Sequence, residues 1–479
     1  MPLLAILVCA ISFIAGVRGQ ELVMVGLAML TTVVAFVPVA AQRLLHPDRR
    51  HLFISFMCLA FLSYFVLPVF TGYFFLREDE TLTIFSLLNL AVSDIIWAQI
   101  AALVSLICLI IGFAAPLGGL ATAIFPIPRH EWGVGNSLLV ALGMILVGWV
   151  LLVLFQLGLV PRQFGSGALG AILNSYFYGL ALLMIVYLRF GSRQALLVLL
   201  VLLPASMIIG FLTGSKRAFL APAAIVAFAH VVTQRRVRAF WIISGLLAVI
   251  LIYPIAQFYR DVVQAGQVLS AAEVLQQPGR LVLLLSSFIA QANPLEYVEA
   301  GIDATANRLN YLGILTLIVR DAGERVPFQG GWTIGLAFIS FIPRIIWPGK
   351  PVTSIGQFVT DTFGSGPQIQ SATGPSQIGE FYFNFGWPGI VIGWILLGIY
   401  FRAISEMFFR KDAPTISLLI AVVALWATVP AFGGTLTNVI SGLIFQAGYF
   451  GVLHVMVRVL LGTTVPSRRN EANASLPFR

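Results

Sequence analysis

The sequence predicts an all-α polytopic membrane protein with about 12 transmembrane helices. Hydrophobic residues make up 59% of the 479 residues and charged residues only 10%, whereas a soluble domain carries about 25% charged residues. The apolar runs are continuous over about 17–25 residues, the length that a helix needs to cross a bilayer. They lack the alternation of apolar and polar residues that marks a transmembrane β-strand.

Twelve apolar runs with short polar turns between them have the length of spanning helices. The first has no basic segment before it and no small-residue cleavage site after it, so we interpret it as a retained helix rather than a signal peptide. The runs lie at about 2–17, 22–41, 52–75, 97–118, 137–159, 168–188, 195–214, 218–232, 239–257, 387–404, 414–432 and 438–460.

The distribution of Lys and Arg in the short turns predicts the orientation, because cytoplasmic turns carry an excess of these residues. With the N-terminus in the cytoplasm, most basic turns lie inside, including those that hold Arg189, Arg235 and Arg410, and the acidic run 78–80 lies outside. Both termini are therefore expected in the cytoplasm. The net charge of +9 follows largely from these turns and requires no nucleic acid partner.

The longest interruption of the apolar pattern falls between the ninth and tenth expected spans, on the outer side. It is far longer than the usual loop of about 4–6 residues, which indicates a functional region. Its apolar stretches at 281–292 and 332–347 are too short or too interrupted to span, so we interpret them as interfacial or re-entrant helices. The expected organisation is an N-terminal bundle of about nine spans (1–257), an extracytoplasmic catalytic region (258–386), three C-terminal spans (387–460) and a cytoplasmic tail (461–479).

Metal and nucleotide chemistry find no support in the sequence. Residues 165–170 match the pattern GxGxxG, but no strand precedes them, so a glycine turn that permits close helix packing is favoured over a nucleotide site. The three cysteines have no paired spacing. None of the five histidines lies in the outer region. We therefore expect no metal and no cofactor.

Two adjacent cations, Lys216 and Arg217, follow Gly214 and Ser215 on the outer side, where the charge rule disfavours them. They require an anionic partner, which can be a lipid headgroup, a carboxylate of the protein or a bound phosphate. The planar Arg fork suits phosphate oxygens and Lys adds a compact charge. A pair of side chains that snorkel to the interface explains them equally well.

Arg344 and Glu380 are the strongest site candidates in the outer region because apolar and aromatic residues flank each of them. A charge in such surroundings is costly to bury and usually marks a functional site. A buried structural pair between these two residues is the alternative. The neighbours Arg320 and Asp321 are expected to pair locally.

The residues around these two charges resemble a known family. The runs 342–344 and 347–351, followed by 378–386 and Gly389, resemble the O-antigen polymerases, the Wzy-type oligosaccharide repeat-unit polymerases of bacterial envelopes. Residues 214–217 are similar to the Gly-x-Arg element of this family. The layout of about a dozen spans with one large outer region also resembles it.

The resemblance implies a glycosyltransferase of the bacterial inner membrane that acts in O-antigen, capsule or exopolysaccharide biosynthesis. The growing chain on undecaprenyl diphosphate would be the donor, a hydroxyl of a new lipid-linked unit the acceptor, and undecaprenyl diphosphate the leaving group. The implied partners are undecaprenyl-diphosphate-linked oligosaccharides and membrane lipid, with a chain-length regulator as a candidate protein partner. No metal, nucleotide sugar or nucleic acid is implied.

The chemistry of that reaction assigns roles to the candidate residues. Fixed cations in a low-dielectric site best stabilise the charge that develops on a diphosphate, and a sugar hydroxyl requires a base. We therefore interpret Arg217 and Arg344 as diphosphate ligands and Glu380 as the general base. The candidate substrate-binding residues are Lys216, Arg260 and Lys350 for the diphosphate and Trp347, Tyr382 and Asn384 for the sugar.

Two other classes remain as alternatives. O-antigen ligases share the architecture, but as a family they carry a functional histidine in the large outer loop, and this sequence has none between Tyr259 and Glu380. A flippase or transporter of lipid-linked oligosaccharide often has repeated halves and interrupted helices. No convincing internal repeat is found and the charged candidates lie outside the expected spans, so a polymerase is favoured.

Overall fold

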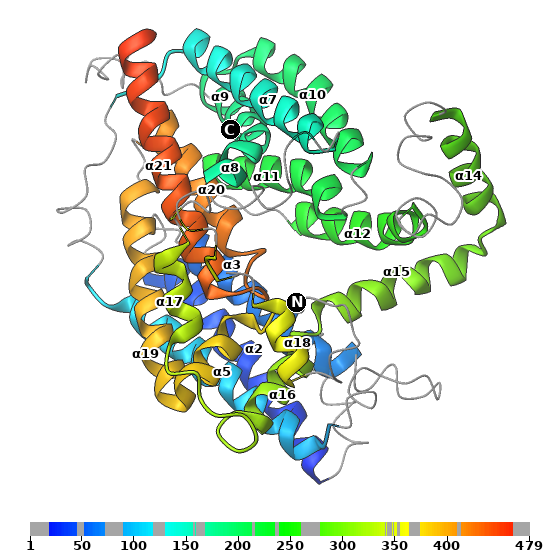
Figure 1. Ribbon diagram of the computed structural model, residues 1–479, viewed down its shortest axis with the longest axis vertical. Coiled ribbons are helices and arrows are strands. Elements are labelled where there is room, and N and C mark those ends of the chain that lie inside the picture. Colours follow the sequence, from blue (N-terminus) through cyan, green and yellow to red (C-terminus); the bar gives the residue numbers. More distant parts are fainter. Residues whose placement is uncertain are drawn as a thin grey trace. The chain divides into compact units, whose positions relative to one another are not determined.

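Helices form the regular secondary structure in the part of the chain that this computed structural model describes, with one isolated β-bridge between Ala322 and Val326 (Figure 1). Seven of the described helices are long and apolar enough to cross a membrane. The prediction of an all-α membrane protein is thereby confirmed. The described residues are 19–45, 52–71, 90–117, 130–156, 159, 168–212, 216–234, 239–259, 278–340, 342, 347, 349–351, 355–363, 374–409 and 413–462.

Seven of the twelve expected spans coincide with these long helices. A π-helical segment continues one of them, so that α3 and η1 together cover most of the expected third span. The elements are α2 (Gln20–Leu45), α3 (Leu52–Phe61) with η1 (Leu62–Val66), α5 (Val92–Ala114), α7 (Val134–Gln156), α10 (Arg193–Leu212), α19 (Ser376–Phe408) and α21 (Leu436–Leu460).

Four further expected spans form helices with other bounds. The span expected at 168–188 is divided at Asn174 into α8 (Ala168–Leu173) and α9 (Ser175–Phe190). The span expected at 414–432 ends early, as α20 (Thr415–Thr428), because Pro430 disfavours helical backbone in the residue before it. The spans expected at 218–232 and 239–257 correspond to α11 (Lys216–Gln234) and α12 (Ala239–Tyr259). The run expected at 2–17 lies outside the described residues.

Short helices occupy the described parts of the expected outer region. The apolar stretch at 281–292 lies in α14 (Pro278–Gln291), and the stretch at 332–347 forms α17 over Trp332–Ile339 only. Their helical structure is confirmed, and their place at or in the membrane remains a prediction. The other helices are α15 (Pro294–Leu309), α16 (Tyr311–Asp321) and α18 (Gly356–Phe363).

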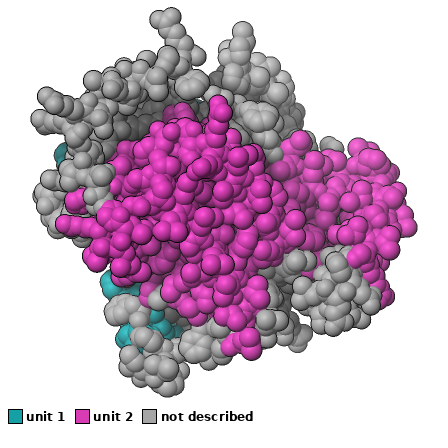
Figure 2. All heavy atoms as spheres, turned by 90° about the horizontal axis from the view of Figure 1, so that it is seen from above, with its two compact units in different colours: residues 1–120, 306–405, 427–441 teal, residues 121–305, 406–426, 442–479 magenta. Residues whose placement is uncertain are grey.

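The chain is divided into two compact units, which Figure 2 colours separately. Each unit combines segments that lie far apart in the sequence, whereas the expected four-part division follows the order of the chain. That division concerns membrane topology and remains a prediction. Unit 1 comprises 1–120, 306–405 and 427–441, and unit 2 comprises 121–305, 406–426 and 442–479.

Glycines bring α5 and α19 into close contact in unit 1. A Cβ at Gly112 would lie 2.1 Å from the carbonyl oxygen of Ile395, and one at Gly398 would lie 2.4 Å from that of Leu109. Small residues at such contacts allow helix backbones to approach, as is typical of helix pairs in membranes. The pairing therefore depends on the absence of a side chain at both positions.

An aromatic cluster fills the core of unit 1. The ring of Phe61 lies 4.9 Å from that of Phe432 and 5.1 Å from that of Trp394, measured between centroids, and all three side chains are buried. Offset or edge-to-face aromatic pairs at such distances contribute about 0.5–1.5 kcal/mol beyond the area they bury. The cluster joins α3, α19 and the turn at residues 431–435 that precedes α21.

In unit 2, α7 and α9 pack closely along their length. A Cβ at Gly148 would lie 2.7 Å from the amide nitrogen of Tyr176, and one at Gly179 would lie 2.6 Å from the carbonyl oxygen of Ala141. The hydroxyl of Ser175 also donates to the carbonyl of Met144 at 2.7 Å. The interruption before α9 thus places a polar side chain where it bonds to the neighbouring helix.

Candidate functional site

The helix α19 is interrupted inside its length and forms two arms. Gly386 has φ 63° and ψ −148°, a backbone conformation that is essentially restricted to glycine. It separates a short arm, residues 376–385, from a long arm, residues 387–408. Glu380, Tyr382 and Asn384 all lie on the short arm.

The two arms bend sharply onto each other. A Cβ at Gly389 would lie 2.4 Å from the carbonyl oxygen of Phe381, although the two residues are eight positions apart. A Cβ at Gly393 would lie 2.4 Å from the ring of the same phenylalanine. Eight residues of straight helix would separate such groups by about 12 Å. The arms therefore form a tight helical hairpin that requires glycine at the contact positions.

The loop before α17 supplies donors to the end of the short arm. The amides of Gln329 and Gly330 donate to the carbonyls of Phe383 and Asn384, at 2.9 and 3.1 Å. The amide of Gly331 donates to Oδ1 of Asn384 at 3.0 Å. The last carbonyls of a helix have no partner within the helix, so this loop satisfies groups that the hairpin turn leaves unpaired.

The start of the short arm is bonded to the turn that precedes α21. The amides of Ser376 and Gln377 donate to the carbonyls of Gly433 and Phe432, at 3.2 and 3.3 Å. Oγ of Ser376 accepts from the amide of Gly379 at 3.2 Å and caps the arm, a common role of Ser at a helix start. Ser376 has φ 61°, which is rare for a residue other than glycine and marks a strained position.

The carboxyl group of Glu380 is fully buried at the N-terminus of α21. Oε2 accepts from the amide of Leu436, the first residue of that helix, and Oε1 accepts from the hydroxyl of Thr437 at 3.0 Å. The first amides of a helix lack partners within the helix and attract negative charge. Glu380 therefore caps α21 from another element.

Thr437 and Asn384 extend this contact to α17. The Thr437 hydroxyl lies 2.6 Å from the carbonyl oxygen of Thr333 and 3.0 Å from Oε1 of Glu380. A hydroxyl has one hydrogen, so it donates to only one of these acceptors at a time. Nδ2 of Asn384 donates at 2.7 Å to Oγ1 of Thr333 and at 2.7 Å to the carbonyl of Glu380. We call Thr333, Glu380, Asn384 and Thr437 the polar lock.

The polar lock can bind α17, α19 and α21 together, and it can also accept a proton. A carboxyl group with 0% exposure is costly to bury unless hydrogen bonds compensate its charge. When the Thr437 hydroxyl donates to the carbonyl of Thr333 instead, Glu380 has one hydrogen bond fewer. In the described part of the chain, no group of three or more His, Cys, Asp or Glu side chains could hold a metal ion.

Two predicted sugar-binding residues lie in different surroundings. Tyr382 is buried, and its ring lies 5.7 Å from that of Trp387 and 6.3 Å from that of Phe328. Trp347 is exposed. Asn384 is the predicted sugar-binding residue that the structure brings to Glu380, through the polar lock.

Lys350, a predicted diphosphate ligand, contacts the backbone after α17. Its Nζ donates to the carbonyls of Ser340 and Ile342, both at 2.9 Å. Lysine near a helix C-terminus commonly bonds to the last carbonyls in this way. These contacts hold the segment after α17 in place.

The remaining predicted cations have no described side chains. Arg260 and Arg344 lie outside the described residues. Lys216 and Arg217 begin α11, and their side chains lie outside the described part of the structure. Their roles, and the alternative of an Arg344–Glu380 pair, remain predictions.

The predicted local pair of Arg320 and Asp321 is confirmed. Nε and Nη2 of Arg320 bond to the two carboxylate oxygens at 2.8 and 2.9 Å, and Nη1 of Arg325 lies 3.1 Å from Oδ1. The hydrogen bonds that Arg320 donates to Asp321 raise the pKa of the Arg320 guanidinium. This cluster closes the turn after α16.

Sequence reasoning missed Thr333 and Thr437, the partners of Glu380. A local signal exists for α21, because Gly433 and Gly434 precede Thr435, whose Oγ1 caps the helix by accepting from the amide of Asn438 at 3.2 Å. A cap of this kind marks a helix start. It does not identify the carboxylate that binds the same helix end from another segment.

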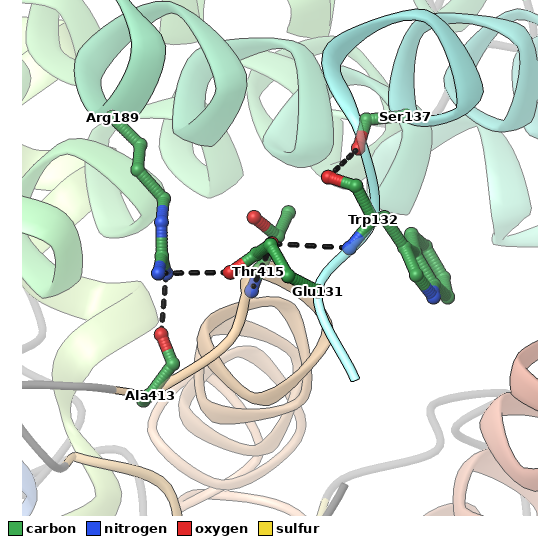
Figure 3. A network of polar contacts seen from close by, with 6 residues as sticks. All are labelled: Glu131, Trp132, Ser137, Arg189, Ala413 and Thr415. Carbon is green, nitrogen blue, oxygen red and sulfur yellow. Dashed lines mark hydrogen bonds and ion pairs between the residues drawn. The ribbon is translucent and has the colours of Figure 1, made fainter. Parts of the chain in front are cut away.

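A second polar network lies in unit 2, where Figure 3 shows it. Oε2 of Glu131 lies 2.8 Å from Nη2 of Arg189, and Oε1 accepts from the amide of Thr415 at 3.0 Å. Arg189 also donates to the carbonyl of Ala413. Glu131 therefore caps α20, and Arg189, in the last turn of α9, ties that helix to the same point.

The helical fold and its long apolar segments define a membrane-embedded all-α protein. A family model described as "Domain of unknown function (DUF8712)" matches residues 29–409. The chain belongs to this family. No curated protein and no solved structure matches the chain.

Proposed function

We propose that this protein polymerises undecaprenyl-diphosphate-linked oligosaccharide repeat units on the outer side of the bacterial inner membrane. The reaction is a metal-independent glycosyl transfer in the synthesis of a surface polysaccharide. The observation that carries the proposal is the buried carboxyl group of Glu380, because an ionisable residue buried among apolar side chains in a membrane-embedded protein is a functional candidate.

The resemblance to the O-antigen polymerases supports the proposal. The C-terminal part of the matching motif forms a defined structural element. Residues 378–386 and Gly389 together form the helical hairpin, with Glu380 on its short arm. A charged residue, a glycine-restricted turn and a strained Ser376 occur within eleven consecutive positions. Strain that the surrounding structure maintains is common at functional sites.

The proposed mechanism assigns the diphosphate to cations. Arg217 and Arg344 stabilise the charge that develops on undecaprenyl diphosphate as the glycosidic bond breaks, with Lys216, Arg260 and Lys350 as further ligands. Fixed positive groups in a site that excludes water are the most effective means of stabilising such charge. Lys350 must exchange its backbone acceptors for phosphate oxygens in order to take part.

Glu380 is proposed to take the proton from the acceptor hydroxyl. Oε1 loses one hydrogen bond when the Thr437 hydroxyl donates to the carbonyl of Thr333, which lies at the shorter of the two distances. Because the carboxyl group is fully buried, the acceptor reaches it only when the contact between the short arm and α21 opens. Asn384, Tyr382 and Trp347 are the proposed sugar contacts.

The topology belongs to the proposal as well. We propose about 12 spans with both termini in the cytoplasm, which orients the region 258–386 outward. Membrane lipid surrounds the spans, and a chain-length regulator is the proposed protein partner.

The test uses a deletion strain that carries the wild-type gene, Glu380→Gln, Arg344→Ala, or Glu324→Gln as a control for an exposed carboxylate. We expect single repeat units, facing outward, in both site variants and full-length polymer in the control. Immunoblots of membranes must show equal amounts of protein. Normal chain length in both site variants would refute the proposal.

The same strains separate the alternatives. A flippase defect leaves lipid-linked units facing the cytoplasm, whereas a polymerase defect leaves them outside. A ligase defect leaves long polymer on the lipid carrier. Gel analysis of the glycan together with its accessibility in intact cells distinguishes these three outcomes.

A further inference from the structure

Exposed apolar residues form a stripe along α15. Leu295, Val298 and Ile302 are all exposed and their spacing of three and four residues places them on one face of the helix. The acidic residues Glu296, Glu299 and Asp303 follow them at the next position each time. The helix therefore presents an apolar stripe beside an acidic row.

Another face of α15 packs against α12. A Cβ at Gly301 would lie 2.2 Å from the carbonyl oxygen of Ile250, and the Tyr297 hydroxyl donates to the carbonyl of Leu251. This contact holds the orientation of α15, so the apolar stripe cannot turn inward without breaking it.

The preceding helix, α14, has the same two-sided character. Leu284 and Leu285 pack against the cluster around Tyr259 at the end of α12, and the ring of Phe288 lies 4.3 Å from that of Phe258. On the remaining surface Val282, Leu283 and Ile289 are exposed. Figure 1 shows that α14 and α15 meet at an angle after α12.

We propose that α14 and α15 lie in the interface of the bilayer, with Leu295, Val298 and Ile302 in contact with lipid. On α12, which α15 contacts, Leu247 and Leu251 are exposed as well. The two helices have 14 and 16 residues, about 21 and 24 Å, which is shorter than a hydrocarbon core of about 30 Å. The three carboxylates of α15 disfavour a spanning position further. The proposal rests on the membrane-embedded fold and is independent of the glycosyl transfer.

The acidic row of α15 predicts how this helix is oriented in the interface and whether it requires anionic lipid. Glu296, Glu299 and Asp303 must face water, because a carboxylate in the acyl region is costly. A helix with this charge gains nothing from anionic headgroups, so burial of apolar surface is the driving term. The stripe should therefore insert as deeply into bilayers of pure phosphatidylcholine as into bilayers that contain anionic lipid.

The experiment compares neighbouring positions in the full-length protein. Cys9, Cys58 and Cys108 are replaced by alanine, and single cysteines are introduced as Leu295→Cys and Val298→Cys. The matched controls are Glu296→Cys and Glu299→Cys, one residue further on. Each is labelled with the fluorophore NBD in phosphatidylcholine vesicles and quenched separately by doxyl-labelled lipid and by aqueous iodide.

We expect the lipid-borne quencher to act about twofold or more strongly at 295 and 298 than at their neighbours, since the apolar face of an interfacial helix lies about 5–10 Å deep. Iodide should show the reverse order, and anionic lipid should leave the lipid-borne quenching unchanged. Equal quenching at all four positions would overturn the proposal. So would labels at 295 and 298 that neither quencher reaches, because a protein then covers the stripe.

Discussion

At the scale of single residues, the burial of Glu380 depends on the polar groups that bond to its carboxyl group. A hydrogen bond to a charged group contributes about 1.5–3 kcal/mol, and a buried donor left without an acceptor costs about 1–3 kcal/mol. The Leu436 amide and the Thr437 hydroxyl both bond to this carboxyl group. These hydrogen bonds offset part of the cost of burying the carboxyl group, and each donor becomes costly to remove alone.

Thr437→Val should lower the free energy of unfolding by about 1–2 kcal/mol, because the valine cannot donate to Glu380 or Thr333. Thr437→Ser should retain most of the stability, since it keeps the hydroxyl. Thr316→Val is a matched control, because among the described residues the hydroxyl of this buried threonine bonds to the carbonyl four residues before it in its own helix. Thermal unfolding in detergent measures all three, and equal losses for the two valine variants would contradict the role of Thr437.

Sequence reasoning identified some of these residues and missed others for a physical reason. Glu380 was recognisable because a charge stood among aromatic residues, and the pair Arg320–Asp321 because its members are adjacent. The hydrogen bond from Thr437 to Thr333 joins residues 104 positions apart. Nothing in local composition or period encodes such a pairing, because it arises only when distant segments pack.

At the scale of elements, the hairpin of α19 was not predicted. The sequence indicated a span from about 387 and assigned the residues before it to the outer region. Gly386 and Pro388 interrupt the apolar pattern there, and the short arm, residues 376–385, is about half the length that a span requires. The break was thus visible in the sequence, whereas the helical arm before it was not.

Gly389→Ala should destabilise the protein by about 1–3 kcal/mol, because the new methyl group would overlap the Phe381 carbonyl. Gly451→Ala is the matched control within a helix, since a Cβ there has nothing within 4 Å. That variant should be neutral or more stable by up to about 1 kcal/mol. We expect a lower unfolding temperature for Gly389→Ala and an unchanged or higher one for Gly451→Ala, and equal decreases in both would contradict the tight hairpin.

Glu131 and Arg189 should be coupled, because both fix the start of α20. The side chains are 14% and 27% exposed, so their interaction exceeds that of a fully exposed pair and we expect a coupling of about 1 kcal/mol. A double-mutant cycle with Glu131→Gln and Arg189→Gln measures it through thermal unfolding. Additive effects would show that the network in Figure 3 contributes no pairwise stability.

At the scale of the whole molecule, composition and the length of the apolar runs predicted the fold class. They did not predict which segments group into each compact unit. Unit 1 joins 1–120 to 306–405, and unit 2 includes 121–305 together with C-terminal segments. An apolar helix has hydrophobic residues on every face, so the periodicity of its sequence does not indicate which helices are its neighbours. Contacts such as that of Gly112 with Ile395 could therefore not be predicted from the sequence.

The proposed orientation makes a prediction for intact cells. In a variant without the native cysteines, Glu296→Cys should react with a membrane-impermeant maleimide from the outside, because the region 258–386 faces outward in the proposed topology. A cysteine introduced as Ser467→Cys, in the expected cytoplasmic tail, should react only after the membrane is opened. The reverse pattern would contradict the orientation and the extracytoplasmic site with it.

The most direct test reconstitutes the purified protein in vesicles with undecaprenyl-diphosphate-linked repeat units from its own host. The products are followed by gel electrophoresis of the glycan and by release of undecaprenyl diphosphate, in the presence of EDTA and without nucleotide sugars. We predict a ladder of lengthened chains with the wild-type protein and single units with Glu380→Gln. A folded wild-type protein that lengthens no chain would contradict the account.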